Sequence, residues 1–452
     1  MSFKTLLASI TADYENSTPT SRQVFERASK VLPGGVSGNL RYFAPYPLYM
    51  RGGSGAQTID VDGNAYIDCF LCNGPLLLGH KNPDVVEAIA RAADYGPLVL
   101  NPDILTQCAE ELCDLIPCAE RVRFLNSGTE ALTSAVRYAR GYTGRTKILK
   151  FFGHYHGQDD QFLIGASPRR EPFSKGIAAS AYADTLTIPI NDTNALFQTI
   201  AENKGAIATA VLDPAMHAGG LWGVDKSFLE TLRQVTSDEG IVLILDEVIT
   251  GFRLAPGGAQ EVYGITPDLA TFAKALGAGE RLAAVAGKAE IMQVVDPVAG
   301  DPNRRVFQSG TGNDSTAGLF AATAAMQAYK RLGRGGEYTR LSRVAENLAS
   351  GLIGVFAEFD LPLRVNQRAS MLQLFLTDQD PEFSTFYDLD QTLIDAFYLA
   401  MMVEGVVLSL PTSNHIYLSF EHGDTEVAAI LDAARTVLGR YPFLQAFKDN
   451  GD

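Results

Sequence analysis

Basic residues are scarce in this 452-residue chain, where 37 Lys and Arg stand against 52 Asp and Glu and leave a formal net charge of −15. Nucleic acids and anionic membrane surfaces select basic proteins, so neither is expected as a partner. Long apolar runs are also lacking, and polar residues interrupt the short apolar stretch near the start of the chain. We therefore expect no secretion signal, no membrane span and a cytoplasmic location.

Cysteines are few as well, and their odd number, five, does not suit a disulfide framework. Cys69 and Cys72 form a CxxC pair, but no second pair follows at the spacing of a zinc ribbon. His154 and His156 lie close together without a carboxylate or third ligand at useful spacing. We predict reduced thiols buried as small hydrophobic residues, and no metal site.

The chain has no low-complexity tract, internal repeat or obvious linker, and its 46% hydrophobic content can form a large core. Short apolar runs alternate with helical patterns in its middle, where a helix capped by Asp225 separates two of the runs. This alternation predicts a parallel sheet covered on both faces. The buried strands are expected at residues 121–126, 147–152, 207–213 and 241–248.

The pattern of predicted elements changes from about Thr323 onward, where a long helical stretch precedes short strand candidates and a final helix. We predict three parts. Residues 1–60 form an N-terminal segment that packs with the small domain, residues 61–325 form the large domain, and residues 326–452 form a smaller α+β domain.

A candidate phosphate site follows the first of these strands. Ser127, Gly128 and Thr129 come between the strand and a helix rich in Ala, Leu and Val. The N-terminus of such a helix offers free backbone N–H groups and the positive end of its dipole. The alternative is an ordinary helix cap in which Glu130 completes a capping box, and this alternative is about as probable from the motif alone.

Asp246 ends the strand 241–248, at the edge where open α/β sheets bind ligands. Three interpretations compete: an acid that holds magnesium in a nucleotide triphosphatase, a carboxylate that keeps a ring nitrogen protonated, or a residue that only caps the next loop. The first needs a GxxxxGK[ST] loop, which the chain lacks. The chain also has no GxGxxG opening a helix, so a dinucleotide site is poorly supported.

Lys274 and Tyr155, together with the phosphate turn and Asp246, have the residue types that bind a single flat, phosphorylated cofactor. Lys274 lies in the apolar segment Pro267–Gly277, and a lysine in such surroundings can have a lowered pKa and form Schiff bases, although a surface lysine is the usual finding. Tyr155, flanked by glycines in GHYHG, could stack on a flat heteroaromatic ring.

Over nearly its whole length the sequence resembles the class III, or ω-type, pyridoxal-phosphate aminotransferases of fold type I, and within them the glutamate-1-semialdehyde 2,1-aminomutase-like branch. The matching segments are PGGVSGNLRYF (33–43), GPLLLGH (74–80), NSGTEA (126–131), GHYHG (153–157), LDEVITGFR (245–253), PDLATFAKALGAG (267–279) and SGT (309–311). The resemblance implies an α/β fold with a mostly parallel, seven-stranded large sheet and a small α+β domain built from both chain ends.

The same resemblance implies a pyridoxal 5′-phosphate site. Ser127, Gly128 and Thr129 would bind the phosphate, Tyr155 and Val248 would cover the two ring faces, Asp246 would pair with the pyridine nitrogen, and Lys274 would form the internal aldimine. Thr311 would reach the phosphate of the neighbouring subunit, which implies a homodimer with shared sites. Arg41 would bind the substrate carboxylate as a bidentate fork. Lys274 and Asp246 are thus the predicted catalytic residues.

Departures from the family pattern bear on the substrate. Asp213-Pro214 replaces the usual Glu-Pro, Ala218 or a neighbour replaces the residue expected near the phenolic oxygen of the cofactor, and Asn414 stands where the aminomutase branch has an acid. Residues 157–181, with Arg169, Arg170 and Lys175, have the composition of a mobile cover over the site.

The sequence therefore predicts amino transfer between a carboxylate-bearing amino compound, of β or ω type among the possibilities, and an oxo acid. The alternative within the same chemistry is an intramolecular reaction of the glutamate-1-semialdehyde 2,1-aminomutase type. An alternative of another class is a noncatalytic dimer that binds the cofactor.

Overall fold

The computed structural model describes residues 3–167, 174–298, 301–303, 305–379, 383 and 389–450. Part of the predicted cover, including Arg169 and Arg170, lies outside these residues. The chain forms two compact units, one of Met1–Asn82 with Thr339–Asp452 and one of Pro83–Tyr338. The predicted three-part division at residues 60 and 325 stays a prediction.

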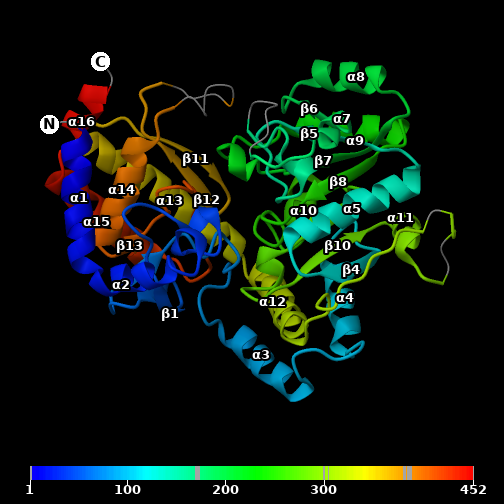
Figure 1. Ribbon diagram of the computed structural model, residues 1–452, viewed down its shortest axis with the longest axis horizontal. Helices are drawn as coiled ribbons and strands as arrows, with labels where there is room; N and C mark the ends of the chain where they lie inside the picture. Colours follow the sequence, from blue (N-terminus) through cyan, green and yellow to red (C-terminus); the bar gives the residue numbers. More distant parts are fainter. Residues whose placement is uncertain are drawn as a thin grey trace. The chain divides into compact units, whose positions relative to one another are not determined.

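The unit of residues 83–338 is built on a seven-stranded sheet in the order β4-β10-β9-β8-β7-β5-β6 (Figure 1). Its strands are β4 (Arg121–Leu125), β5 (Lys147–Phe151), β6 (Thr185–Ile188), β7 (Ile207–Leu212), β8 (Val242–Asp246), β9 (Leu269–Phe272) and β10 (Ala283–Gly287). Only β10 runs antiparallel to its neighbours. The mostly parallel sheet is therefore confirmed, as are the four strands expected from the apolar runs.

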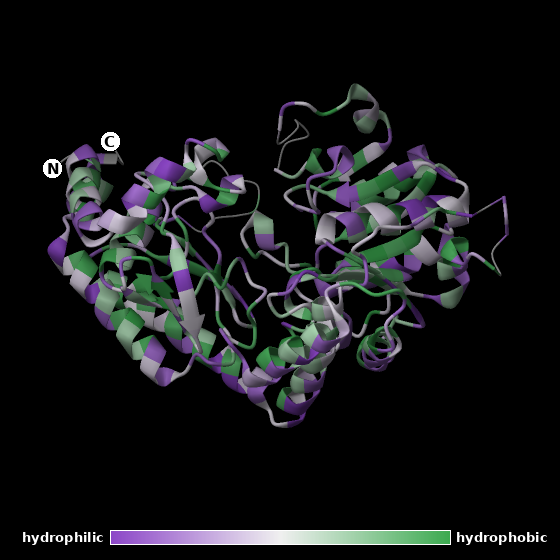
Figure 2. Ribbon diagram, turned by 60° about the horizontal axis from the view of Figure 1, so that its bottom comes forward, coloured by the Kyte–Doolittle hydropathy of each residue, from purple (hydrophilic) through white to green (hydrophobic). Residues whose placement is uncertain are grey.

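Helices cover both faces of this sheet because its strands are apolar on both sides. Ile148 and Ile244 pack with helix α5 (Gly128–Thr143). Their neighbours Leu149 and Leu245 point the other way, into a second core with α8 (Thr193–Glu202) and α9 (Lys226–Asp238). In Figure 2 the strands of this sheet appear as predominantly hydrophobic ribbon. The unit also contains α3 (Pro83–Tyr95), α4 (Ile104–Leu115), α6 (Asp160–Leu163), α7 (Ala179–Ala183), α10 (Gly258–Tyr263), α11 (Ala289–Met292) and α12 (Thr316–Arg334).

The other unit combines the two ends of the chain, as expected. One sheet has the order β1-β2-β3-β13 and the other β11-β12-β14. The strands are β1 (Met50–Ser54), β2 (Gln57–Asp60), β3 (Ala65–Asp68), β11 (Arg364–Arg368), β12 (Met371–Phe375), β13 (Val406–Val407) and β14 (Ile416–Tyr417). The helices are α1 (Phe3–Ser17), α2 (Pro19–Ala28), α13 (Glu337–Glu358), α14 (Thr392–Val403), α15 (Asp424–Arg440) and α16 (Phe443–Asn450). Because β3 pairs directly with β13, residues far apart in sequence share one sheet.

The prediction for the thiols holds only in part. Cys69, Cys108 and Cys118 are buried, whereas Cys72 is exposed, so the expected burial is wrong for this residue. The reason is local: Cys72 lies in a turn in which Leu71, Cys72, Asn73 and Gly74 all have positive φ, and this turn points its side chain outward.

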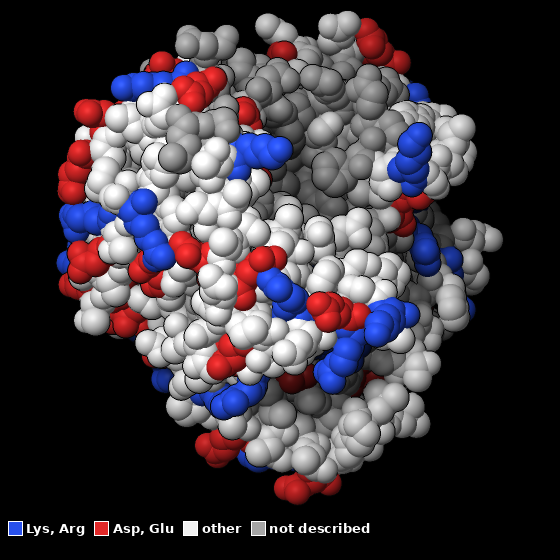
Figure 3. All heavy atoms as spheres, turned by 60° about the vertical axis from the view of Figure 1, so that its left-hand side comes forward, with Lys and Arg blue, Asp and Glu red and all other residues white. Residues whose placement is uncertain are grey.

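Charges of both signs are interspersed on the face that Figure 3 shows, with no extended basic patch there. Among the described residues, no helix is both long enough and apolar enough to cross a membrane.

Candidate active site

Five strand ends meet at one edge of the large sheet. The helix α5 begins just after β4, Tyr155 follows β5, Asp213 follows β7, Asp246 ends β8, and Lys274 follows β9. These strands run in the same direction, so their carboxyl ends lie at the same edge, where α/β sheets bind ligands. The fold thus gathers residues that are spread over about 150 positions of the chain.

The turn before α5 is both a helix cap and an open helix N-terminus. Ser127 is the N-cap residue, and its Oγ accepts a hydrogen bond from the backbone N–H of Glu130 at 3.2 Å. The Glu130 carboxylate in turn accepts from the N–H of Asn126 at 2.9 Å. The predicted N-cap is therefore present, but the capping box is incomplete because Glu130 accepts from Asn126 and not from the N-cap residue Ser127.

The backbone of Gly128 packs closely against its neighbours. A Cβ at this residue would lie 3.1 Å from Cγ2 of Val248 and 3.7 Å from the Cβ of Ala273. The predicted phosphate turn therefore lies against Val248 and against the residue that precedes Lys274. On its other side, the Oγ1 of Thr129 accepts a hydrogen bond from the N–H of Gln158 at 3.3 Å.

Asp246 is buried and its carboxylate is surrounded by donors. One oxygen accepts from the N–H of Val248 at 3.1 Å and from Thr271 Oγ1 at 3.4 Å. The other lies 2.7 Å from Nδ1 of His156. Burial, followed by the nearby charge of Asp213, raises the pKa of Asp246 to about 7. A cationic partner would reverse this effect, because an opposite charge favours the ionised carboxylate.

His156 is a site residue that the sequence analysis missed. Exposure alternates along the residues after β5: Tyr155 is 37% exposed, whereas His154 and His156 are buried with their rings next to each other. Their spacing in the sequence suggests only a metal site, which lacks a third ligand. The signal that could have found their position is the i, i+2 spacing around a tyrosine that is expected to face the ligand.

Lys274 has a strained backbone, with φ of +45°. A residue with a Cβ rarely adopts this conformation, and such strain is concentrated at functional sites. Burial, together with the charge of Arg253, lowers the pKa of the Lys274 amine to about 8, although Asp246 and Asp213 oppose the shift. A substantial fraction of this amine is therefore neutral, and nucleophilic, at mildly alkaline pH.

Asp213 and His217 form a hydrogen-bonded carboxylate–imidazole pair at the end of β7. The Asp213 carboxylate accepts from the N–H of Ala215 at 3.0 Å and from the N–H of His217 at 3.1 Å, and it also contacts the His217 ring. Burial alone would raise the pKa of Asp213, but the contacts with His217 hold it below its ordinary value. The aspartate that departs from the family pattern thus remains charged.

Lys150 is fully buried in β5 and was not singled out from the sequence. Its Nζ donates to the carbonyls of Phe162 and Ile164 at 2.6 and 2.8 Å. Burial lowers the pKa of Lys150 to about 7, and the charge of Asp246 opposes this shift. Lys150 shares this strand with Lys147, so its residue type alone does not mark it as a site residue.

Three residues singled out from the sequence, Thr311, Arg41 and Asn414, do not follow these strand ends in the chain. Thr311 is exposed, and the loop that carries it contacts the phosphate turn of its own chain, since Asn126 Nδ2 donates to Asn313 Oδ1 at 3.0 Å. Arg41 is exposed in a 3₁₀ turn of the other unit. Asn414, in the same unit as Arg41, has φ of +56° and donates to Gln391 Oε1 at 3.4 Å.

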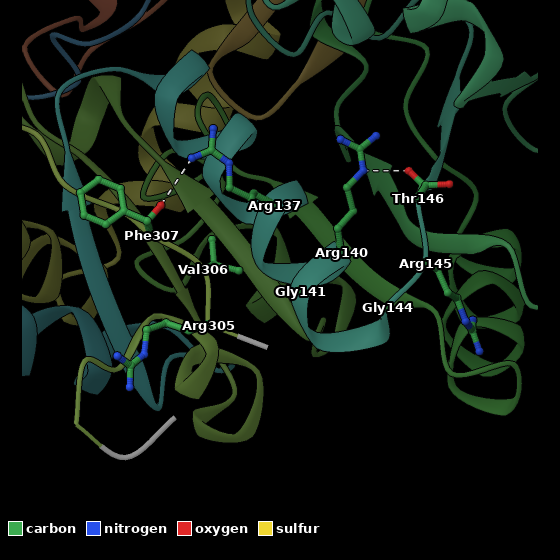
Figure 4. A pocket seen from close by; sticks show the side chains of 9 residues that line it. All are labelled: Arg137, Arg140, Gly141, Gly144, Arg145, Thr146, Arg305, Val306 and Phe307. Carbon is green, nitrogen blue, oxygen red and sulfur yellow. Dashed lines mark hydrogen bonds between the residues drawn. The ribbon is translucent and has the colours of Figure 1, made fainter. Parts of the chain in front are cut away.

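A pocket of about 560 Å³ lies elsewhere in the large unit and contains none of the predicted site residues (Figure 4). It is lined by Arg137, Arg140, Gly141, Gly144, Arg145, Thr146, Arg305, Val306 and Phe307. The guanidinium groups of Arg145 and Arg305 point away from those of Arg137 and Arg140 (Figure 4). Arg140 donates to the carbonyl of Thr146 at 2.7 Å, and Arg145 to those of Ile207 and Glu239 at 3.1 and 2.9 Å. These contacts tie loops together and do not converge on one ligand.

Comparisons with known proteins define the class. Residues 43–383 match the Aminotransferase class-III family, and the chain belongs to this family. It is 39% identical to the glutamate-1-semialdehyde 2,1-aminomutase of Methanothermobacter thermautotrophicus over 92% of this chain and 98% of the relative. The enzyme of the same name from Myxococcus xanthus is also 39% identical, over 92% of this chain and 96% of the relative.

Solved structures agree on the fold. An ω-transaminase from Sphaerobacter thermophilus superposes with a TM-score of 0.86 at 33% identity, over 93% of this chain and 97% of that one. A transaminase with pyridoxal phosphate bound superposes with a TM-score of 0.85 at 30% identity, over 94% of this chain and 98% of that one. The protein is therefore a pyridoxal 5′-phosphate-dependent enzyme with the expected fold, and both expectations from the sequence are confirmed.

The residues at the strand ends fit this cofactor. An open helix N-terminus suits a phosphate, a buried carboxylate suits a cationic ring nitrogen, and a desolvated amine suits an aldehyde carbon. When bound, the cofactor supplies an electron-accepting ring.

Proposed function

We propose that the protein moves an amino group on a carboxylate-bearing amino compound within a single molecule, as an aminomutase of the glutamate-1-semialdehyde type. The observation that carries this proposal is the name shared by relatives that are 35–39% identical over about 92% of the chain. The sequence alone favoured transfer between two molecules. The names of the relatives support the intramolecular reaction better, so this reaction is now the first candidate and transfer between two molecules the second.

In this proposal each strand end has one task. Ser127, Gly128 and Thr129 hold the cofactor phosphate, and Tyr155 and Val248 enclose its ring. Asp246 pairs with the ring nitrogen, and Lys274 attaches the cofactor covalently. The assignments are supported by the packing of Gly128 against Val248 and by the donors that surround Asp246.

The protein groups then handle protons and charge. With the cofactor bound, the amine of Lys274 would be the base that removes a proton from one carbon of the substrate and returns it to another. A pKa near 8 keeps part of this amine unprotonated, as a base must be. A cationic ring nitrogen would keep Asp246 ionised, since an opposite charge favours the carboxylate, and the N–H of Val248 and the hydroxyl of Thr271 donate to the same carboxylate.

The second candidate is transfer between two molecules, from an amino donor to an oxo acid. Two observations favour it: Asn414 stands where the aminomutase branch has an acid, and the ω-transaminase from Sphaerobacter thermophilus is 33% identical. A noncatalytic cofactor-binding dimer is disfavoured by the intact pair of Lys274 and Asp246.

One experiment separates these functions. The purified enzyme, loaded with cofactor, is expected to isomerise glutamate 1-semialdehyde over many turnovers with no oxo acid present. If conversion stops after one equivalent of cofactor and resumes when an oxo acid is added, transfer between two molecules is the correct function. A bound cofactor whose visible absorption never responds to an amine donor would indicate the noncatalytic dimer.

Arg41 is expected to bind the substrate carboxylate. Arg41→Ala should raise the KM for carboxylate-bearing substrates by about 10- to 100-fold, because a charge-assisted hydrogen bond contributes about 1.5 to 3 kcal/mol. Arg41→Lys, which keeps the charge without the fork, should recover only part of this loss. A simple amine without a carboxylate is the control substrate, and its KM should not change. Equal KM values for the carboxylate substrate in the wild type and in Arg41→Ala would remove Arg41 from the site.

The assembly and location are also proposals. We infer a homodimer in which Thr311 of each subunit reaches the cofactor phosphate of its partner, supported by the resemblance of the SGT segment to the family. Sedimentation as a single species of monomer mass would contradict it. We further infer a cytoplasmic enzyme with reduced thiols, which labelling of all five cysteines in the freshly isolated, denatured protein would test.

A further inference from the structure

Two ring nitrogens in the core beside Asp246 have no hydrogen-bond partner. In the part of the chain that the structure describes, Nε2 of His154 and Nε2 of His156 are both buried and both unpaired. The side chain of His154 is 0% exposed and that of His156 is 2% exposed. The two rings are neighbours, with centroids 5.9 Å apart and planes at 55°. Buried polar atoms are nearly always paired in native proteins, with protein or with ordered water, so this pair requires a partner.

The contacts of His154 determine which of its nitrogens carries the proton. Its Nδ1 accepts a hydrogen bond from the backbone N–H of Asp213 at 3.1 Å, so this nitrogen must be unprotonated. Burial lowers the pKa of His154 to about 3, and the ring is therefore neutral at working pH. A neutral ring has one N–H, which must then be on Nε2. The unpaired nitrogen of His154 is a donor.

His156 has the opposite arrangement. Its Nδ1 lies 2.7 Å from the Asp246 carboxylate, and burial, together with the charge of Lys150, lowers the pKa of His156 well below its ordinary value. When Asp246 is ionised it can only accept, so the single ring proton of His156 is on Nδ1. The unpaired nitrogen of His156 is therefore an acceptor.

We propose that one buried water joins these two nitrogens, accepting from Nε2–H of His154 and donating to Nε2 of His156, and that His154 is thereby a positioning residue for Asp246. The carboxylate of Asp246 needs the proton of His156 on Nδ1. A water that donates to Nε2 stabilises this tautomer, and His154 holds the water. The function of Asp246 toward the ring nitrogen rests on the proposed function, whereas the water and the tautomers do not.

The surroundings leave few other partners for these nitrogens. The ring of Phe151 packs on His154 with centroids 5.7 Å apart, and the ring of Phe162 packs on His156 at 6.0 Å. Four titratable groups act on the two histidines or accept from them: Lys150, Asp213, His217 and Asp246. The Lys150 amine donates to the carbonyls of Phe162 and Ile164. The carboxylate of Asp213 is occupied by His217 and Ala215.

The test reads the tautomers directly, by NMR of ¹⁵N-labelled histidine in the full chain at about pH 8.5, without cofactor. Only six histidines contribute, and His154→Phe and His156→Phe identify the two signals. In the wild type we expect His154 to be protonated on Nε2 and His156 on Nδ1. In His154→Phe the His156 signal should move toward the Nε2-protonated form or a mixture, while His154→Gln, whose amide can still donate, should restore the wild-type signal. Phe151→Leu is the packing control and should leave the His156 tautomer unchanged.

A crystal structure at high resolution gives the second readout, which needs no variant. We expect a water within hydrogen-bond distance of both Nε2 atoms in the wild type and in His154→Gln. A dry gap, a wild-type His156 protonated on Nε2, or a His156 tautomer that is unchanged in His154→Phe would each overturn the proposal. If the tautomers and the water are as expected but the enzyme moves no amino group, only the proposed function fails.

Discussion

Replacing Lys274 with Ala is expected to abolish covalent attachment of the cofactor and to lower turnover by at least about 10²- to 10⁴-fold, the usual contribution of a positioned proton-transfer group. The physical reason is that Lys274 is the amine that the fold presents at the strand ends in strained backbone, with its pKa lowered to about 8. Reduction with borohydride followed by peptide mass spectrometry should locate the modification on Lys274 in the wild type and find none in Lys274→Ala.

Two controls sharpen this test. Lys226→Ala changes an exposed lysine of α9 whose nearest carboxylate lies 3.9 Å away, and it should leave attachment intact. Because the neutral amine is the nucleophile, the rate of cofactor capture by the unloaded wild type should rise with pH through about 8 and then level off. Borohydride labelling of Lys150 in the wild type would mean that the other buried lysine holds the cofactor.

Asp246→Asn is expected to retain cofactor but to lose about 10²- to 10³-fold in turnover, because a neutral amide does not stabilise a protonated ring nitrogen as a carboxylate does. The side chain keeps its size, so the packing around it should survive. The measurement is turnover under saturating cofactor, with cofactor content determined in parallel. Near-normal turnover at full occupancy would reject the role of Asp246.

The same substitution makes a prediction for the chain without cofactor. Burial raises the pKa of Asp246 from 3.8 to about 7, so the folded state favours the protonated acid. The contribution of Asp246 to the stability of the wild type should therefore fall as pH rises from about 4 through 7, by on the order of a few kcal/mol at most. Asp246→Asn lacks this titration, so its melting temperature relative to the wild type should rise over that range and then level off. A constant difference from pH 4 to 8 would mean that Asp246 is ionised throughout.

The sequence led to most of the site because its groups sit in local motifs. Ser127, Gly128 and Thr129 follow one apolar run and Asp246 ends another, so these strand ends could be located from hydrophobicity, whereas Lys274 was found from its apolar segment and the family motif. The capping alternative for the turn at Ser127 was correct for the Ser127 cap but not for the capping box, since Glu130 accepts from Asn126.

The site residues that sequence analysis missed depend on the direction in which side chains point in the folded chain. The alternation of exposure after β5 leaves Tyr155 partly exposed and both histidines buried, and the contact of His156 with Asp246 joins residues 90 positions apart. Lys150 appeared to be one more residue of a strand, because nothing local indicates that two carbonyls from the segment after Tyr155 will receive its amine. Cys72 was expected to be buried, and the run of positive φ that exposes it has no signature in its residue types.

By itself the sequence determined four of the seven strands of the large sheet, the family and the cofactor, because apolar periodicity and motif spacing are properties of neighbouring residues. Only the tertiary structure decided which groups surround Asp246 and which protonation states burial favours. The pKa values of Asp246 and Lys274 depend on desolvation and on charges such as those of Asp213 and Arg253, which come from other strands and loops. Such effects arise only when the chain has folded and water has been excluded from the edge of the sheet.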